Sequence, residues 1–180
     1  MNMERSKATK AQPDGPENAF VVKPGSNTHG TGLVLDGLGL LLRGRSGAGK
    51  SLLALELLEE FELQGKTALL VSDDRIDLYV FDKKIRLGAP AEIAGMIELR
   101  GRGIVNRPFA QEAHLDLVID LVEEQERFLE EDALKITLLD IEIARCPVPE
   151  RGLIDGPHQR MLVKEAIRDL TSDRQTDGKK

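Results

Sequence analysis

The chain has 180 residues, of which 41% are hydrophobic and 31% are charged, a composition typical of one soluble globular domain. Its formal charge of −6, with five Phe, one Tyr and no Trp, argues against a general affinity for nucleic acid or for anionic membranes. No apolar run approaches the roughly 18 residues of a membrane span, the N-terminus lacks the apolar segment of a secretory signal, and the single Cys146 forms no internal disulfide, so we expect a cytoplasmic protein.

Polar sequence at both ends of the chain predicts two flexible tails, over residues 1–17 and 171–180. One ordered domain is expected between them, over residues 18–170. Its first predicted elements are apolar strands near Thr31–Asp36 and Leu38–Arg43, followed by a helix over Lys50–Leu63. The Gln64-Gly65 pair should end this helix, because glycine adopts the left-handed conformation found at many helix ends.

The segment between the second strand and the helix reads GRSGAGKS and fits the phosphate-loop pattern G-x-x-x-x-G-K-[ST]. Glycines let backbone amides approach phosphate oxygens closely, and the following helix presents its positive end to the same anion. Lys50 adds a mobile positive charge for the phosphates, and Ser51 offers a hydroxyl to Mg²⁺. We therefore predict a site for a nucleoside triphosphate or a similar polyphosphate, formed by Gly44, Arg45, Ser46, Gly47, Ala48, Gly49, Lys50 and Ser51.

Further elements are expected beyond the first helix. Glycines and prolines interrupt Gly88–Pro108, so this segment is predicted to be mostly loop. Apolar runs and turn residues predict a strand at Lys66–Ser72 and a hairpin of Arg75–Phe81 and Lys83–Leu87, with its turn at Asp82-Lys83. A further strand is predicted at His114–Leu121, and two more apolar runs follow at Lys135–Leu138 and Ile141–Arg145. A proline-rich turn, CPVPERG, and a final amphipathic helix at Pro157–Leu170 complete the prediction.

Two adjacent acids, Asp73 and Asp74, follow the strand at Lys66–Ser72. In phosphate-loop proteins a carboxylate at the end of a neighbouring strand helps to hold Mg²⁺ or the nucleophile. One of two such carboxylates could also act as a general base. A solvated turn is the alternative interpretation of the pair. The chain has no N-K-x-D guanine motif, which disfavours a GTPase.

The segment Ile97–Asn106, IELRGRGIVN, places Glu98, Arg100 and Arg102 around two glycines. Such a loop could close over phosphates, with the carboxylate on a metal ion and the guanidinium groups on phosphate oxygens. A charged surface loop is the alternative interpretation.

Taken in order, His29-Gly30, GRSGAGKS, LLVSDDRID and IELRGRGIVN resemble the catalytic domain of HPr kinase/phosphorylase, over Asn27 to Leu170. The resemblance implies an α/β fold with a mixed β-sheet and flanking helices, similar to the phosphoenolpyruvate carboxykinase-like domain of that family. It also implies an ATP- and Mg²⁺-dependent kinase for a serine of the phosphocarrier protein HPr, and assembly as a homohexamer.

The resemblance further implies a role for individual residues. Lys50 and the loop backbone hold the nucleotide, while Ser51, Glu98 and Asp74 contribute to the metal site. The residues that match the family's catalytic groups are Asp73 as the general base, His29 as its support, Lys50, and Arg127 as a catalytic arginine.

Two departures from the family pattern matter. Longer members carry an additional N-terminal domain, so we expect the short form that resembles those of alphaproteobacteria. The segment Pro147–Leu153, PVPERGL, departs from the family's P-V-[RK]-P-G-R-N, which bears on phosphorolysis of the phosphoserine more than on the kinase reaction. A small-molecule kinase with a phosphate loop and a non-catalytic nucleotide-sensing module are the alternative functions.

Overall fold

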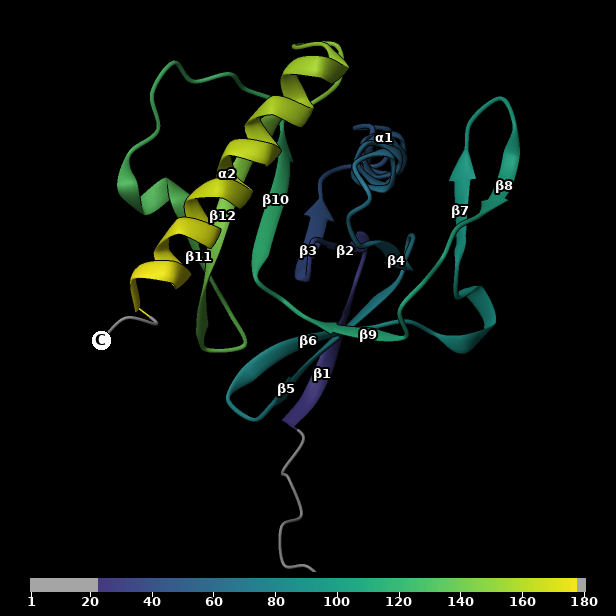
Figure 1. Cartoon of the computed structure of the whole chain (residues 1–180), viewed down its shortest axis with the longest axis horizontal. Coiled ribbons are helices and arrows are strands. Elements are labelled where there is room, and N and C mark those ends of the chain that lie inside the picture. Colours follow the sequence, from purple (N-terminus) through teal and green to yellow (C-terminus); the bar gives the residue numbers. More distant parts are fainter. Residues whose placement is uncertain (1–22, 178–180) are drawn as a thin grey trace, which may run out of the picture.

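The structure, a computed structural model, describes residues 23–177, so the tail predicted over 1–17 lies outside the described residues. The described part is a mixed α/β domain, as predicted. The helices α1 (Lys50–Leu63) and α2 (Gly156–Asp177) cover one face of a six-stranded sheet, and a four-stranded sheet packs against the other face (Figure 1).

The six-stranded sheet has the order β11-β12-β10-β3-β2-β4. Its central strand β10 runs parallel to both neighbours, β12 and β3, and the remaining pairs are antiparallel, which confirms the predicted mixed sheet. The strands are β2 (Thr31–Leu35), β3 (Leu38–Arg43), β4 (Ala68–Ser72), β10 (Leu117–Val122), β11 (Lys135–Leu138) and β12 (Ile141–Pro149). A short 3₁₀ turn, η2 (Glu131–Leu134), precedes β11.

The central strands are buried on both faces, which explains their continuous apolar sequence. Successive side chains of a strand point to opposite faces. Leu40 and Leu42 of β3 accordingly pack among the helices, whereas Leu41 packs against the four-stranded sheet. On β10, Ile119 likewise packs among the helices and Val118 packs against the four-stranded sheet.

The four-stranded sheet has the order β1-β5-β6-β9, all antiparallel, with bounds β1 (Lys23–Thr28), β5 (Ile76–Phe81), β6 (Lys84–Gly88) and β9 (Glu112–His114). The predicted hairpin is confirmed as β5–β6. Asp82 and Lys83 have φ of 49° and 59°, as a two-residue type I′ turn requires. The edge strand β1 was not predicted, since KPGSNT is polar and shows no alternation.

The continuous strand predicted over His114–Leu121 is wrong, because the chain crosses from one sheet to the other within it. The Asp116 N–H donates to the Gly39 carbonyl at 2.8 Å, and the Asp116 carboxylate accepts from the Gly39 N–H, also at 2.8 Å. A Cβ at Gly39 would lie 1.7 Å from the His114 carbonyl oxygen, so only glycine allows this close crossing.

The loop predicted over Gly88–Pro108 is also largely wrong. It contains a short 3₁₀ helix, η1 (Ala91–Ile93), and an antiparallel hairpin of β7 (Met96–Leu99) and β8 (Gly103–Asn106). Gly101 and Gly103, which suggested a loop, have φ of 84° and 97° and lie at the turn of the hairpin. The hairpin stands beside α1, apart from the two larger sheets (Figure 1).

The predicted proline-rich turn is instead the end of β12, which stays paired with β10 up to Pro149. The Glu150 N–H donates to the Val122 carbonyl on β10, so the alternate residues Pro147 and Pro149 turn their nitrogens to the other side. On that side β11 pairs with β12 only as far as Ala144. The prolines therefore interrupt no ladder hydrogen bond.

The two helices end differently from one another. After α1, Gly65 has φ of 70°, its N–H donates to the Glu62 carbonyl, and the Lys66 N–H donates to the Phe61 carbonyl, so the predicted glycine stop is confirmed. By contrast α2 extends to Asp177, past the predicted end at Leu170. Neither helix within residues 23–177 is long and apolar enough to cross a membrane.

Asp120 joins β10 to two neighbouring strands. Its carboxylate accepts hydrogen bonds from Arg43 of β3 at 2.8 Å and from Arg145 of β12 at 2.6 Å. Burial raises the pKa of Asp120, but the hydrogen bonds and charges of the two arginines outweigh burial and lower this pKa overall. The carboxylate is therefore ionised in the folded protein at neutral pH.

We predict that Asp120→Asn lowers the free energy of unfolding by about 3 kcal/mol at neutral pH, because two partly buried guanidinium groups lose their anion. The folded-state pKa of Asp120 lies below the unfolded value, so the wild type loses this contribution as the pH falls below about 4. Urea unfolding of both proteins at neutral pH and near pH 3 measures the difference. A difference that stays constant between the two conditions contradicts the ionic role of Asp120.

Cys146 is 7% exposed and contacts the Leu162 carbonyl, in keeping with the small buried residue that the sequence suggests. Burial raises the pKa of the Cys146 thiol to about 12. A thiol that stays protonated is a poor nucleophile, and Cys146 packs in the core among the helices and the six-stranded sheet.

Candidate active site

The phosphate loop connects β3 to α1, in the strand–loop–helix arrangement that the sequence predicts. Gly44 has φ of 148°, and a Cβ there would lie 2.8 Å from the Leu121 side chain, so glycine is required. Gly49, with φ of 100°, directly precedes α1, and its carbonyl accepts the first helical hydrogen bond, from Leu53 at 2.9 Å. The start of α1 is thus available to an anion.

Lys50 is only 6% exposed, and its ammonium donates to the carbonyls of Gly44 and Arg45 at 3.1 Å each. Burial lowers the pKa of Lys50, while the charges of Asp74 and Asp73 act in the opposite direction. The loop carbonyls thus hold the ammonium at the wall of the cavity that the loop surrounds.

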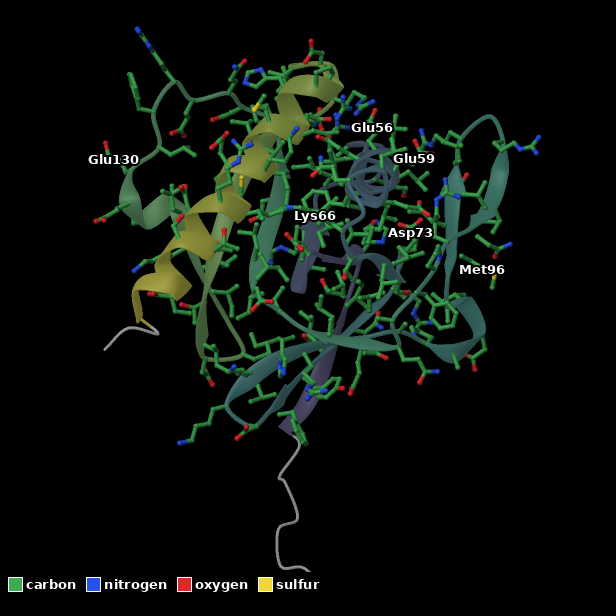
Figure 2. The ribbon with its side chains drawn as sticks, viewed as in Figure 1. Glu56, Glu59, Lys66, Asp73, Met96 and Glu130 are labelled. Carbon is green, nitrogen blue, oxygen red and sulfur yellow. The ribbon has the colours of Figure 1, made fainter. Side chains whose placement is uncertain are left out.

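Asp73 lies at the end of β4, between α1 and β7 in the view of Figure 2. It is 8% exposed, and its carboxylate accepts hydrogen bonds from Thr31 at 2.7 Å, from the Ser51 hydroxyl at 3.1 Å and from the Glu98 N–H at 3.3 Å. These three donors fix the carboxylate against the phosphate loop and orient the Ser51 hydroxyl. Asp73 itself does not line the cavity.

Asp74 faces a different environment from its neighbour. Its φ of 69° departs from strand geometry, its side chain is 70% exposed, and it lines the cavity. The His29 Nδ1 atom lies 3.1 Å from the Asp74 carbonyl oxygen and 3.7 Å from its carboxylate. The structure therefore brings Asp74 and His29 together as an accessible pair.

One cavity of about 350 Å³ collects most of the residues that the sequence singled out. Its lining comes from the turn between β1 and β2, the phosphate loop, the start of α1, the turn after β4, β7 and its turn, and the segment after β12. The lining residues are His29, Ser46, Gly47, Gly49, Lys50, Ser51, Leu52, Asp74, Glu98, Leu99, Arg100 and Arg151. Basic groups and carboxylates thus face the same space, as a site for a polyphosphate and a metal ion requires.

The segment after β12 contacts the phosphate loop and holds it in place. Glu150, 9% exposed, forms a bidentate ion pair with Arg45, and Arg45 also pairs with Glu123 at 2.6 Å. The Arg151 N–H donates to the Ala48 carbonyl at 3.4 Å. Sequence reasoning missed Thr31 and Glu150 as supports, since neither belongs to a motif and each meets its partner only in the folded sheet.

Arg127 does not lie in this cavity. It stacks on Phe128, 5.3 Å from the ring centre, and lines a separate hollow of about 900 Å³ between the segment 123–134, β12 and α2. The structure of a single chain therefore does not bring the predicted catalytic arginine to the phosphate loop.

Comparison with known proteins agrees with this geometry. The family model of the HPr serine kinase C-terminal domain matches residues 22–177. The chain belongs to this family. An HPr kinase/phosphorylase from Clostridium tetani is 32% identical over 146 residues, which cover 78% of this chain and 46% of the relative. One from Geobacillus thermodenitrificans is 34% identical over 142 residues, covering 71% of this chain and 43% of the relative.

Among solved structures, the Hpr(Ser) kinase/phosphatase from Coxiella burnetii matches with a TM-score of 0.68 and 25% identity, over 86% of this chain and 95% of that one. The chain therefore has the fold of an HPr kinase C-terminal domain, as the motifs predict. It spans slightly less than half the length of the two curated relatives.

Proposed function

We propose that this protein transfers the terminal phosphoryl group of ATP to a serine of the phosphocarrier protein HPr. The observation that carries the proposal is the single cavity in which the phosphate loop and Lys50 face an accessible carboxylate, Asp74, with His29 beside it. In phosphoryl transfer a protein contributes mainly positioning and charge stabilisation, and this cavity supplies groups for both. The choice of HPr as the acceptor rests on the names of the relatives.

We move the role of general base from Asp73, where the resemblance places it, to Asp74. Asp73 is held by three donors and does not line the cavity, so we propose that its role is to orient the Ser51 hydroxyl. Asp74 is accessible, so we assign it the general base that accepts the proton of the serine hydroxyl. His29 contacts the backbone and carboxylate of Asp74 and would hold the carboxylate in place as the proton transfers.

The oxygen groups of the cavity fit Mg²⁺. Within residues 23–177 no cluster of three or more His, Cys, Asp or Glu side chains could hold a metal ion by itself. Mg²⁺ in nucleotide sites commonly takes one or two carboxylates and completes its octahedron with phosphates and water. Ser51 and Glu98 would hold the ion here, and Asp74 is close enough to the same space to join them. When bound, the ion would neutralise charge on the phosphates.

Phosphorolysis of the phosphoserine would use the same site. In that reaction an oxygen of inorganic phosphate bonds to the phosphorus of the phosphoserine, the bond to the serine oxygen breaks, and pyrophosphate leaves. The attacking inorganic phosphate gives up its proton to Asp74, and Asp74 passes a proton to the departing serine oxygen. Glu150 is already paired with Arg45 in the segment that departs from the family pattern, so we expect the kinase direction to be the stronger.

Incubation with HPr and Mg-ATP, followed by mass spectrometry of HPr, tests the proposal. We expect one added phosphoryl group on a serine, and none on an HPr variant that has alanine at that position. A panel of small alcohols and amino acids in place of HPr tests for a small-molecule kinase. Tight ATP binding without transfer to any acceptor would instead indicate a nucleotide-sensing module. Light scattering in the same buffer tests the homohexamer that the resemblance implies.

A further inference from the structure

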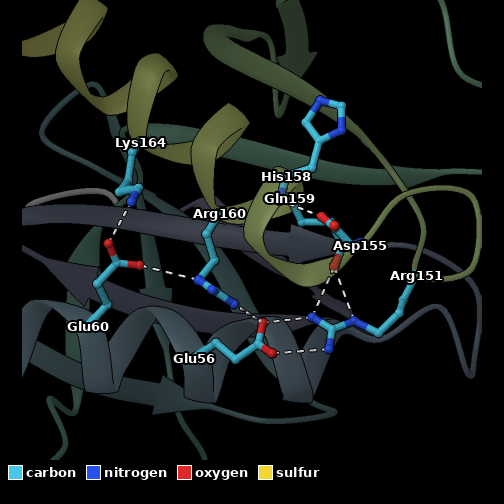
Figure 3. Close-up of polar contacts among 8 residues, drawn as sticks. All are labelled: Glu56, Glu60, Arg151, Asp155, His158, Gln159, Arg160 and Lys164. Carbon is cyan, nitrogen blue, oxygen red and sulfur yellow. Dashed lines mark hydrogen bonds and ion pairs between the residues drawn. The ribbon is translucent and has the colours of Figure 1, made fainter.

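A ladder of ion pairs joins α1, α2 and the segment after β12 (Figure 3). Glu56 of α1 lies 2.7 Å from Arg151 and 3.0 Å from Arg160 of α2. One turn further along α1, Glu60 pairs with Arg160 at 3.3 Å and with Lys164 at 2.5 Å. All five side chains are 23–29% exposed, so the ladder is partly shielded from water.

Arg151 differs from the other basic residues of the ladder because it also belongs to the phosphate site. It lines the cavity, its N–H donates to the Ala48 carbonyl, and its Cβ would lie 3.4 Å from a Cβ added at Gly49. Arg160 and Lys164 do not line this cavity. The ladder therefore reaches the active site through one residue.

The guanidinium of Arg151 is held by two partners. It donates to both carboxylate oxygens of Glu56, at 3.1 Å and 2.7 Å, and twice to the side-chain oxygen of Gln159, at 3.3 Å and 3.2 Å. Gln159 is fully buried and is itself fixed by the Pro149 carbonyl at 2.9 Å. These bonds use four of the five N–H donors of a guanidinium, so one donor, on Nη1, is left for an anion.

We infer that Glu56 is a positioning residue, which holds the Arg151 guanidinium at the wall of the cavity in the orientation from which it contacts the transferred phosphoryl group. The inference rests on the proposed function and names a further residue for the same site. An arginine that is already ordered loses little side-chain entropy when it meets a phosphate, and fixed groups stabilise a transition state better than mobile ones.

The charge state of Glu56 supports this role. Burial raises the pKa of Glu56, but the hydrogen bonds and charges of Arg151 and Arg160 outweigh burial and lower it overall. Glu56 is thus a carboxylate at neutral pH and makes a bidentate, charge-assisted contact, which is the contact that best fixes a guanidinium.

Loss of Glu56 should change turnover more than affinity, because two effects on affinity oppose each other. Removing the carboxylate leaves the Arg151 guanidinium held by Gln159 alone, which makes it less ordered and weakens its contact with an anion. The same change also removes a negative charge near the phosphates, which strengthens binding. By contrast, no second effect compensates for a misplaced contact with the transferred phosphoryl group. A small misplacement of a catalytic contact is enough to lower a rate substantially.

The test compares Glu56→Gln with Glu60→Gln, a matched control that removes charge from the same helix and ladder without touching Arg151. We expect Glu56→Gln to lower kcat for HPr phosphorylation about ten-fold, with the Kd for Mg-ATP changed less than about three-fold. Glu60→Gln should stay within about two-fold of wild type in both, even where the two variants lose similar thermal stability. Equal effects of the two variants on kcat would overturn the inference.

A double-mutant cycle separates positioning from stability. If Glu56 acts through Arg151, Glu56→Gln should cause no further loss of kcat in an Arg151→Ala background. Glu56→Asp, which keeps the charge, should recover part of the activity and replaces Glu56→Gln in the cycle should that variant fold poorly. Additive losses would show that Glu56 acts independently of Arg151 and would overturn the inference.

A spectroscopic arm distinguishes this inference from the proposed function, because it needs no acceptor. The Nη1–H signal of Arg151 comes from the group that donates to Glu56. Assigned by its loss in Arg151→Lys, it should be sharp and resolved in the wild type and in Glu60→Gln, and averaged in Glu56→Gln. Addition of pyrophosphate should shift it in the wild type. If these spectroscopic results are obtained but no phosphoryl group is transferred to HPr, only the proposed function is contradicted. If the signal is unchanged in Glu56→Gln, only the positioning role of Glu56 is contradicted.

Discussion

Asp74→Asn should lower kcat for serine phosphorylation about a thousand-fold while leaving ATP binding nearly unchanged. The reason is that an amide of the same size cannot accept the serine proton, and a positioned general base contributes between about a hundred-fold and ten-thousand-fold. The side chain is exposed and pairs only with His29 among the described residues, so the fold should tolerate the change. Single-turnover transfer from Mg-ATP to HPr, with a parallel titration of ATP, measures both quantities.

Asp73→Asn is the informative comparison for Asp74→Asn. Asp73 accepts from Thr31, Ser51 and the Glu98 N–H, so its replacement should lower thermal stability and weaken Mg-dependent nucleotide binding. The two neighbouring variants are thus expected to fail in different ways. Should Asp74→Asn retain near-normal kcat while Asp73→Asn loses it without a change in ATP affinity, the roles are reversed and Asp73 is the base.

Lys50→Met should also reduce transfer about a thousand-fold, expressed as kcat/KM, because the cavity loses the buried positive charge that faces the phosphates. Methionine has nearly the length of lysine and can pack in the same space, so the expected loss is chemical. Thermal unfolding checks that the variant is folded.

Lys66→Met is the control for this substitution. Lys66 follows α1, pairs with Asp36 at 2.9 Å and does not line the cavity. We expect this variant to keep kcat/KM within about two-fold of wild type, since a surface ion pair contributes little. Similar losses in both lysine variants would indicate a general effect of net charge on HPr docking and would refute the specific role of Lys50.

The parts of the molecule that were predictable from sequence are those governed by local rules. The GRSGAGKS motif between an apolar strand and a leucine-rich helix placed the phosphate loop, Lys50 and Ser51. The Asp82-Lys83 turn and the Gly65 stop were predicted because positive φ values favour particular residues. In each case the residues that determine the structure lie within a few positions of one another.

The parts that were not predictable depend on partners far along the chain. The polar strand β1 exists because β5 offers it an edge, and the prolines of β12 are tolerated because β11 ends at its pairing with Ala144. Asp73 and Asp74 differ in exposure because the positive φ of Asp74 interrupts the strand geometry. No pattern in the two-residue sequence distinguishes the buried acid from the accessible one.

The cavity is completed late in the synthesis of the chain. Its walls come from His29 near one end of the described chain and from Arg151 near the other, with β10 and β12 completing the sheet behind them. A nascent polypeptide on the ribosome therefore displays the phosphate loop long before the wall opposite it has been made. The complete cavity therefore forms only after β12 has been synthesised and has paired with β10.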